Sequence, residues 1–409
     1  MLFLEVLADN PVALLHGARQ AGKSTLAQWV ATEERRARYL TLDDAGVLAA
    51  ARGDPVGFIG GLEEPVVLEE VQRAPELFLA IKASVDRDRR AGRFLLTGSA
   101  DVMLLPDLSE SLAGRMEVLT LWPLSQGEVE GVKEGFIDAV FSDTLPNKMK
   151  IGENISKLLT RIVRGGYPVV HGRASEDRQK AWFGSYITTI LQRDVRDLAN
   201  IEGLTQLPRL LSLLAARATS LLNLSELSRS IAIPLTTLKR YMALLETTFL
   251  VRTLPAWSGN LGKRLVKAPK LVLCDTGLMS SLLGLDVTRL ATDTNLLGPL
   301  VENFMVMELE KQRAWSRTRP HLFHFRTQTG QEVDMVLEDP AGRLVGIEVK
   351  AGATVNNQDF KGLRAFAEIA GRRFHRGVVL YTGTESIPFG SQLNALPLSA
   401  LWSIGAKKK

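Results

Sequence analysis

Residues Gly17-Ala-Arg-Gln-Ala-Gly22-Lys23-Ser24 follow the spacing G-x-x-x-x-G-K-[ST] and decide the fold of the first part of the chain. An apolar run, Pro11–Leu15, precedes them, and a helical pattern from Ser24 to about Arg38 follows. Glycines at this spacing let backbone N–H groups turn inward around phosphate oxygens, and the start of the helix adds a partial positive charge. We therefore predict a phosphate-binding loop between a buried strand and a helix.

The loop also predicts contacts with a nucleoside triphosphate. The Lys23 amine is expected to reach the β- and γ-phosphates, and the Ser24 hydroxyl is expected to ligate Mg²⁺. ATP and Mg²⁺ are therefore the expected cofactors. The residues predicted to surround the nucleotide are Gly17, Ala18, Arg19, Gln20, Ala21, Gly22, Lys23, Ser24, Thr25 and Ser99.

Two acids, Glu69 and Glu70, directly follow a second apolar run, Pro65–Leu68. Acids at the end of a buried strand are costly unless they face a cation. We predict that Glu69 faces the magnesium ion and that Glu70 polarises the attacking water. A solvated pair at the end of a strand is the alternative interpretation.

Two further residues are candidates for contact with the γ-phosphate. Ser99 follows a third apolar run, Arg93–Leu96, and a polar side chain there can sense that phosphate. Arg115, at the end of Leu112–Arg115, could stabilise transition-state charge within one subunit or across a subunit interface. A homo-oligomer is thus an open alternative, as are a plain turn at Ser99 and a surface role for Arg115.

Strands alternating with helices predict an α/β fold with a mostly parallel sheet in the N-terminal region. Parallel strands are covered on both faces, which explains their continuous apolar runs. The pattern changes twice along the chain and predicts three regions. These are an N-terminal domain at 1–135, a mainly helical region at 150–290 and a second α/β domain at 296–409.

The helical region contains a predicted helix-turn-helix or winged-helix module at about 222–250. Ser225 can cap the first helix, and Pro234 lies at the turn. One face of the second helix is apolar and carries Leu235, Leu238, Tyr241, Met242 and Leu245; the other carries Thr236, Thr237, Lys239 and Arg240. Insertion into the major groove of DNA and packing against another domain both remain open.

Acids and a lysine meet in the C-terminal α/β region, where strands are expected at 321–326, 333–337, 344–349 and 377–381, with helices at 302–313 and 359–370. Glu348 and Lys350 share one face of a strand because side chains repeat every two residues. With Asp334 on a neighbouring strand, they could activate water for phosphodiester cleavage. The expected magnesium ligands are Glu302, Asp334 and Glu348. The alternative is an edge strand with solvated charges.

Composition narrows these expectations. The chain has 409 residues with 50 basic and 45 acidic side chains, and this mildly basic balance allows a nucleic-acid partner without requiring one. Its single cysteine, Cys274, excludes an intramolecular disulfide, and five histidines argue against zinc. With no apolar run long enough to span a membrane and no leader pattern, we expect a reducing, cytoplasmic location.

Together these motifs resemble a prokaryotic family that joins an AAA-type P-loop ATPase domain to a C-terminal DUF4143 domain. The end of the chain also resembles the PD-(D/E)xK nuclease superfamily. The family usually has Asp where Glu69 stands, and the segment before the loop is short for the N-terminal helix that is common in the family. The family-like motifs are Gly17–Thr25, Glu69–Pro75, Leu95–Ser99, Leu112–Arg115, Pro123–Ser125, Gly165–Pro168, Arg193–Val195, Lys270–Gly277, Glu332–Asp334 and Glu348–Lys350.

The resemblance implies ATP binding and hydrolysis. The leading hypothesis is an ATPase whose nucleotide cycle controls a nuclease-like C-terminal domain that acts on DNA or another nucleic acid. The alternative is an ATP-dependent regulatory switch whose nuclease-fold module is catalytically inactive and binds a partner. A third hypothesis is a nucleotide-binding regulator in which Glu69 is poorly placed for turnover.

Overall fold

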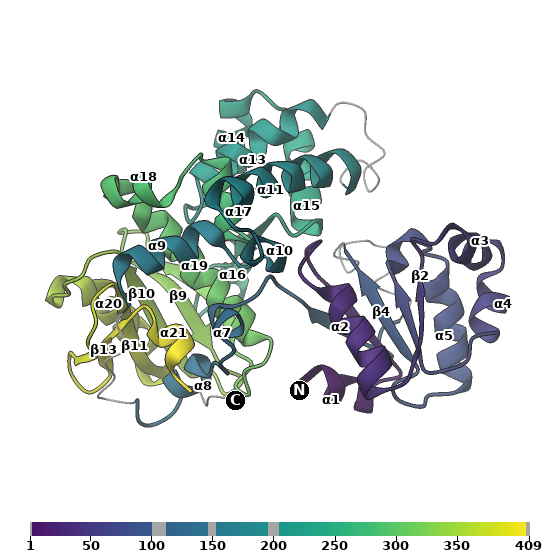
Figure 1. Ribbon diagram of the computed structural model, residues 1–409. Helices are drawn as coiled ribbons and strands as arrows, with labels where there is room; N and C mark the ends of the chain where they lie inside the picture. The colour runs from purple at the N-terminus through teal and green to yellow at the C-terminus, as the bar shows by residue number, and fades with distance from the viewer. Residues whose placement is uncertain (1, 100–111, 146–152, 195–203, 406–409) are drawn as a thin grey trace. The chain divides into compact units, whose positions relative to one another are not determined.

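A computed structural model describes residues 2–99, 112–145, 153–194 and 204–405 (Figure 1). Val195, the last residue of one family-like motif, lies outside these ranges. The chain divides into two compact units. The first comprises Met1–Pro123 and Leu244–Leu250, and the second comprises Leu124–Ala243 and Val251–Lys409.

A five-stranded sheet with the order β2-β3-β4-β1-β5 forms the centre of the first unit, and all its pairings are parallel. Because the strands are parallel, the loops after β1, β3 and β4 all leave the sheet at the carboxyl ends of the strands. This end is called the carboxyl edge of the sheet. The strands are β1 (Val12–His16), β2 (Arg38–Thr41), β3 (Val66–Glu69), β4 (Phe94–Gly98) and β5 (Met116–Thr120). The helices are α1 (Leu2–Asp9), α2 (Lys23–Trp29), α3 (Ala45–Gly53), α4 (Pro55–Gly60) and α5 (Leu77–Arg87).

Each central strand contributes side chains to two separate cores. Leu14 and Leu96 pack with α5 on one face, whereas Leu15 and Leu95 pack with α1 and α2 on the other. Helices α2 and α5 accordingly lie on opposite sides of β4 (Figure 1). Alternate residues of a strand point to opposite faces, so a continuous apolar run is needed where helices cover both. The predicted α/β fold with a parallel sheet is therefore confirmed for this unit.

Three local features of this unit differ from the expectations. The helix after the loop gives way to a π-helical turn, Val30–Glu34, and the chain then enters β2. The two edge strands, β2 and β5, were not predicted because their half-exposed residues lack the apolar run of a central strand. Leu2–Asp9 do form a helix, α1, because Val6 and Leu7 are buried in the core beside α2.

The second unit begins with helices and ends in a mixed sheet. Its first elements are α7 (Gln126–Glu130), α8 (Phe136–Val140), α9 (Ile155–Arg164), α10 (Pro168–His171), α11 (Glu176–Thr189), α13 (Leu207–Ala216) and α14 (Leu224–Ile231). Next come α15 (Leu235–Thr247), β6 (Val251–Leu254), α16 (Leu261–Val266), β7 (Lys270–Leu273), α17 (Thr276–Leu282), α18 (Val287–Thr292) and α19 (Thr294–Arg313). Helix α15 extends from this unit into Leu244–Leu250 of the first.

The C-terminal sheet has six strands in the order β12-β13-β11-β10-β9-β8. Strands β8, β9 and β10 are antiparallel neighbours, whereas β11 runs parallel to β10. Helix α20 joins β10 to β11 and packs on this sheet through Leu363 and Phe366. The elements are β8 (His321–Arg326), β9 (Glu332–Glu338), β10 (Leu344–Lys350), α20 (Lys361–Ala370), β11 (Phe374–Tyr381), β12 (Ile387–Pro388), β13 (Leu393–Pro397) and α21 (Ala400–Ser403).

Helices α14 and α15 lie where the helix-turn-helix is expected, and Ala232 in the turn has a left-handed φ of 57°. Asn223, two residues before Ser225, caps α14. On α15 the predicted apolar face is buried from Leu238 to Leu245, while Leu235 is exposed. Whether this pair is a nucleic-acid-binding module stays a prediction, as does the division of the second unit at residues 290–296.

Candidate functional site

The phosphate loop connects the end of β1 to the start of α2. Gly17 and Gly22 have φ values of 150° and 103°, which L side chains rarely adopt. A Cβ on Gly17 would lie 2.1 Å from the Leu121 carbonyl oxygen, so only glycine fits there. The loop therefore has the curled backbone that the sequence predicts for phosphate binding.

Lys23 is buried at the first turn of α2, with 5% of its surface exposed. Its Nζ donates hydrogen bonds to the carbonyl oxygens of Gly17 and Ala18, each at 2.9 Å. These bonds hold the amine against the loop itself. The Ser24 hydroxyl lies one residue further on an exposed part of the same turn, so both predicted phosphate-site residues start the helix.

Glu70, Ser99 and Gln72 form a polar group at the edge where β3 and β4 end. The Ser99 hydroxyl donates to Glu70 Oε2 at 2.9 Å, and the Gln72 amide donates to both partners. Glu70 has a left-handed φ of 59°, a conformation that costs a non-glycine residue on the order of 1 kcal/mol or more. Sequence analysis predicted Glu70 and Ser99 separately; Gln72 was missed, although it lies in the same family-like motif.

Glu69 ends β3 and is held by a neighbour that sequence analysis missed. The Tyr39 hydroxyl of β2 donates to Glu69 Oε2 at 2.6 Å. Burial and the adjacent Glu69 carboxylate raise the pKa of Tyr39 far above its usual value. Oxygen donors from Ser24 and Glu69 are the ligand type that Mg²⁺ prefers, so the residues at this edge of the sheet fit the expected ion.

Arg115 lies at the opposite end of the sheet from the loop. Its backbone carbonyl accepts from the first residue of β1, Val12, whereas the loop follows the last residue. Its Nε donates to Asp86 Oδ1 at 2.6 Å, and this bond lowers the pKa of the Asp86 carboxyl. Within one subunit the structure does not bring Arg115 to the phosphate loop, so a role across a subunit interface and a surface role both stay open.

A second cluster forms in the C-terminal sheet and contains all four residues predicted there. Asp334 of β9 accepts from the Val349 backbone N–H at 2.9 Å, which places it against β10. On β10, the Lys350 amine donates to Glu348 Oε1 at 2.9 Å. Glu302 projects from α19. Strand alternation and neighbouring strands thus bring these side chains together as expected.

The cluster also contains Lys270 of β7, which sequence analysis did not assign to it. Its Nζ lies 2.6 Å from Glu302 Oε1 and 3.3 Å from Asp334 Oδ1. The Lys270 ammonium thus lies between two of the three carboxylates that are expected to bind Mg²⁺, and the metal site at Glu302, Asp334 and Glu348 stays a prediction. Within the described ranges, no three His, Cys, Asp or Glu side chains are grouped so that they could hold a metal ion.

Burial shifts the pKa values of this cluster. Burial and the Asp334 carboxylate raise the pKa values of Glu302 and Glu348 to about 8. Burial opposes the charged form of Lys270, yet Glu302 and Asp334 hold its pKa above the usual value. The neighbouring His324 has a pKa lowered to about 4 by burial and by Lys270. The Lys270 ammonium is thus the stable charge at the centre of the cluster.

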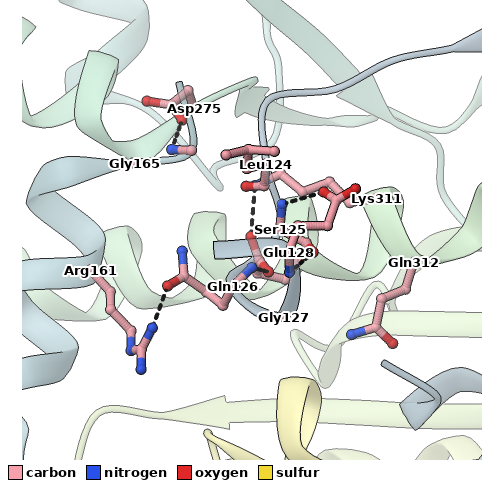
Figure 2. A network of polar contacts seen from close by, with 12 residues as sticks. Leu124, Ser125, Gln126, Gly127, Glu128, Arg161, Gly165, Asp275, Lys311 and Gln312 are labelled. Carbon is pink, nitrogen blue, oxygen red and sulfur yellow. Dashed lines mark hydrogen bonds and ion pairs between the residues drawn. The ribbon is translucent and has the colours of Figure 1, made fainter. Parts of the chain in front are cut away.

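A third group, shown in Figure 2, joins several family-like motifs by buried polar contacts. Asp275 accepts from the Gly166 and Leu278 backbone N–H groups, and a Cβ on Gly165 would lie 2.2 Å from its carboxylate. Lys311 of α19 donates to the Leu124 carbonyl oxygen at 3.0 Å (Figure 2). These contacts explain the glycine in Gly165–Pro168 and mark this network as structural.

Arg161 of α9 connects the same network to α7. It donates to Gln126 Oε1 at 2.8 Å, as Figure 2 shows, and pairs with Glu153 at 2.7 Å. The Gln126 backbone N–H in turn donates to Glu308 Oε2 of α19. A buried arginine with several partners fixes the angle between elements rather than serving a reaction.

Three family matches cover most of the chain. Residues 9–130 match an AAA domain, residues 155–289 match a domain of unknown function (DUF8612), and residues 297–401 match a domain of unknown function (DUF4143). The AAA match supports ATP binding at the phosphate loop. No helix in the described ranges is long and apolar enough to span a membrane.

Relatives that match almost the whole chain exist in two mycobacteria. The chain is 33% identical over 399 residues to Uncharacterized protein Rv2008c of Mycobacterium tuberculosis and to Uncharacterized protein Mb2031c of Mycobacterium bovis. Each alignment covers 97% of this chain and 82% of the relative. A solved variant of RuvB from Thermotoga maritima is 18% identical, with a TM-score of 0.30, over 62% of this chain and 87% of RuvB, and at that score the likeness bears on neither fold nor function. By its matched domains and these relatives, the chain belongs to the family of AAA-type ATPases with a C-terminal DUF4143 domain.

Proposed function

We propose that this protein hydrolyses ATP, with Glu70 as the residue that activates the attacking water. The supporting observation is the bond from Ser99 to Glu70 at the sheet edge where the phosphate loop also emerges. A carboxylate at that edge can accept a proton from water beside the γ-phosphate, and Ser99 with Gln72 would orient it. Lys23 and the loop N–H groups would bind the phosphates, and Ser24 with Glu69 would hold Mg²⁺.

A Glu70→Gln variant tests this assignment. We expect it to bind ATP as the unchanged protein does, because Glu70 is not part of the loop. Its hydrolysis rate should fall by about 10² to 10⁴, the usual contribution of a general base. Phosphate release under magnesium gives the rate, and equilibrium binding of a labelled ATP gives the affinity. Equal hydrolysis rates for Glu70→Gln and the unchanged protein would show that Glu70 does not activate the attacking water.

We further propose that the nucleotide cycle controls the C-terminal unit as a regulatory switch without metal chemistry of its own. The supporting observation is Lys270, whose ammonium lies between Glu302 and Asp334. Mg²⁺- and ATP-dependent cleavage of mixed DNA and RNA substrates is the test, with Lys350→Ala alongside. Cleavage that Lys350→Ala abolishes would favour the nuclease hypothesis instead.

Binding to DNA is the proposed route by which the switch acts, and α15 supplies its exposed Lys239. A Lys239→Glu variant should be retained less on duplex DNA. The slope of log affinity against log salt concentration should become less steep by about the amount that one phosphate contact contributes. Lys361→Glu on α20 is the matched control, since it makes the same charge change at an exposed position of another helix. Retention that does not vary with salt would argue against phosphate contacts.

A further inference from the structure

We propose that Lys270 replaces the divalent cation of the C-terminal cluster, so that Glu302, Asp334 and Glu348 bind a metal ion only when this side chain is absent. The inference deepens the proposed switch function, because it names the residue that keeps the C-terminal unit free of metal chemistry. It rests on the contacts of five side chains in the second unit.

The oxygens of the cluster are already engaged. Asp334 Oδ1 faces the Lys270 amine, and its Oδ2 accepts from the Val349 N–H. Glu302 Oε1 accepts from Lys270 at 2.6 Å, and Thr219 also bonds to this carboxyl. Mg²⁺ and Mn²⁺ need about six oxygen ligands, several of them from the protein or from water. Lys270 therefore takes the position and the oxygens that an ion would use.

One carboxyl oxygen of the cluster has no hydrogen-bond partner, and it indicates how the acids would respond to loss of the lysine. Glu348 Oε2 is buried and has no hydrogen-bond partner, while Glu348 Oε1 accepts from Lys350. A buried carboxyl oxygen without a partner is costly. With Lys270 removed, three buried carboxylates would face a single lysine, Lys350. They would then have to take up protons or a cation.

The strand that carries Lys270 fixes its position within the cluster. Lys270 is the first residue of β7, only 4% of its surface is exposed, and its backbone pairs with Leu254 of β6. Glu332 is a further acid close enough to favour the Lys270 charge, whereas the neighbouring His324 ring of β8, with its pKa lowered to about 4, is uncharged near neutral pH. A lysine this buried is stable only with close carboxyl groups, and Glu302 and Asp334 lie 2.6 and 3.3 Å from its amine.

The experiment measures Mn²⁺ binding by the full chain in the absence of nucleotide, using electron paramagnetic resonance of free Mn²⁺. We expect no saturable site that depends on Asp334 in the unchanged protein. Lys270→Met should gain one saturable site. Its Mn²⁺ affinity should exceed any affinity of the unchanged protein for this cluster by about tenfold or more, because a positive charge is removed within bonding distance of the ion. Adding Asp334→Asn should abolish that site.

Two controls complete the design. Lys263→Met makes the same change on exposed α16 and should gain no site. Lys270→Arg keeps the positive charge and should also gain none. If Lys270→Met fails to fold, Mn²⁺ binding by the unchanged protein and by Lys270→Arg still tests the proposal. A Mn²⁺ site in either that Asp334→Asn removes would overturn the proposal, and so would a folded Lys270→Met without a site.

Because the readout is metal binding, the result is independent of ATP hydrolysis and of DNA cleavage. If the protein hydrolyses no ATP, the proposed function fails while the Lys270 proposal can still hold. Conversely, the unchanged protein could hydrolyse ATP and bind Mn²⁺ at Asp334, which would sink this inference and leave the ATPase intact.

Discussion

The Ser99 hydroxyl donates a hydrogen bond to Glu70 at 2.9 Å, although 29 residues separate them in the chain. The contact arises because β3 and β4 are parallel neighbours whose carboxyl ends meet at one edge. Gln72 bonds to both residues, so the position of the Glu70 carboxylate depends on two donors. Glu70 is thus held in place before any nucleotide arrives.

Removing one of these donors should reduce hydrolysis less than removing the acid. We expect Ser99→Ala to lower the rate about tenfold, the equivalent of one hydrogen bond to a charged group. Ser99→Thr retains a hydroxyl and should recover much of the rate. Steady-state phosphate release measures both variants, and a rate for Ser99→Ala equal to that of the unchanged protein would show that Ser99 does not position Glu70.

Lys23→Met should weaken ATP binding. Loss of a charge-assisted contact to phosphate costs about 1.5–3 kcal/mol, which corresponds to about 10- to 150-fold in affinity. The folded loop should persist, because its glycines set the backbone. Calorimetric titration with ATP and Mg²⁺ measures the change, and Lys263→Met is the control on exposed α16. Unchanged affinity in Lys23→Met would contradict the phosphate-loop assignment.

Arg115 provides a test of assembly. Since Arg115 lies at the far end of the sheet from its own loop, Arg115→Ala should leave the ATP affinity nearly unchanged, and loss of the exposed pair with Asp86 should have little effect on stability. If Arg115 acts across an interface, mixing Arg115→Ala with Glu70→Gln subunits should restore part of the hydrolysis that each lacks. No recovery on mixing would leave Arg115 with a structural role only.

Glu134 should make the protein less stable as the pH rises from about 4.5 to about 8. Burial and the nearby Glu308 carboxylate raise the pKa of Glu134 to about 8, above its ordinary 4.5. The folded state therefore keeps this proton over a range in which the unfolded chain has lost it. Its contribution is fully present below pH 4.5 and is lost as the pH rises through about 8.

Glu134→Gln should reduce that dependence, since an amide does not titrate, while Glu302 and Glu348, whose pKa values are also raised to about 8, continue to contribute to it. The Ser125 hydroxyl and the Gly127 N–H donate hydrogen bonds to the Glu134 carboxyl group. Glu128 and Glu308 are the acids near it that raise its pKa further. Thermal unfolding at pH 6 and pH 9, followed by circular dichroism, measures the difference in Tm. The exposed Glu368→Gln should keep the slope of the unchanged protein, and an equal slope in Glu134→Gln would contradict the prediction.

Local patterns predicted the central strands and the loop because both depend on residues next to one another. Leu14 and Leu15 are apolar because two different cores cover them, and this leaves a visible run. The edge strands leave no such run. Tyr39 and Lys270 were missed for a different reason: the partners of Lys270 lie 32 and 64 residues away, and no periodicity records such contacts.

One signal could have pointed to Lys270. It begins the family-like motif Lys270–Gly277, where a lysine stands directly before a buried apolar run. A lysine in such a position is costly unless an anion pairs with it. The acids predicted in the C-terminal region were the available partners, but their place in space depends on the packing of α19 against β10.

Strand β7 carries Lys270 at its first residue, and Asp275 follows its end after a single residue, Cys274. Five positions therefore separate the side chains that hold the two polar centres of the second unit. Lys270 lies 3.3 Å from Asp334 Oδ1 in the carboxylate cluster, and Asp275 accepts from the Gly166 N–H at 2.7 Å. Because a one-residue slip of a strand moves every side chain on it, a change of register in β7 would displace Lys270 and pull on the segment that carries Asp275.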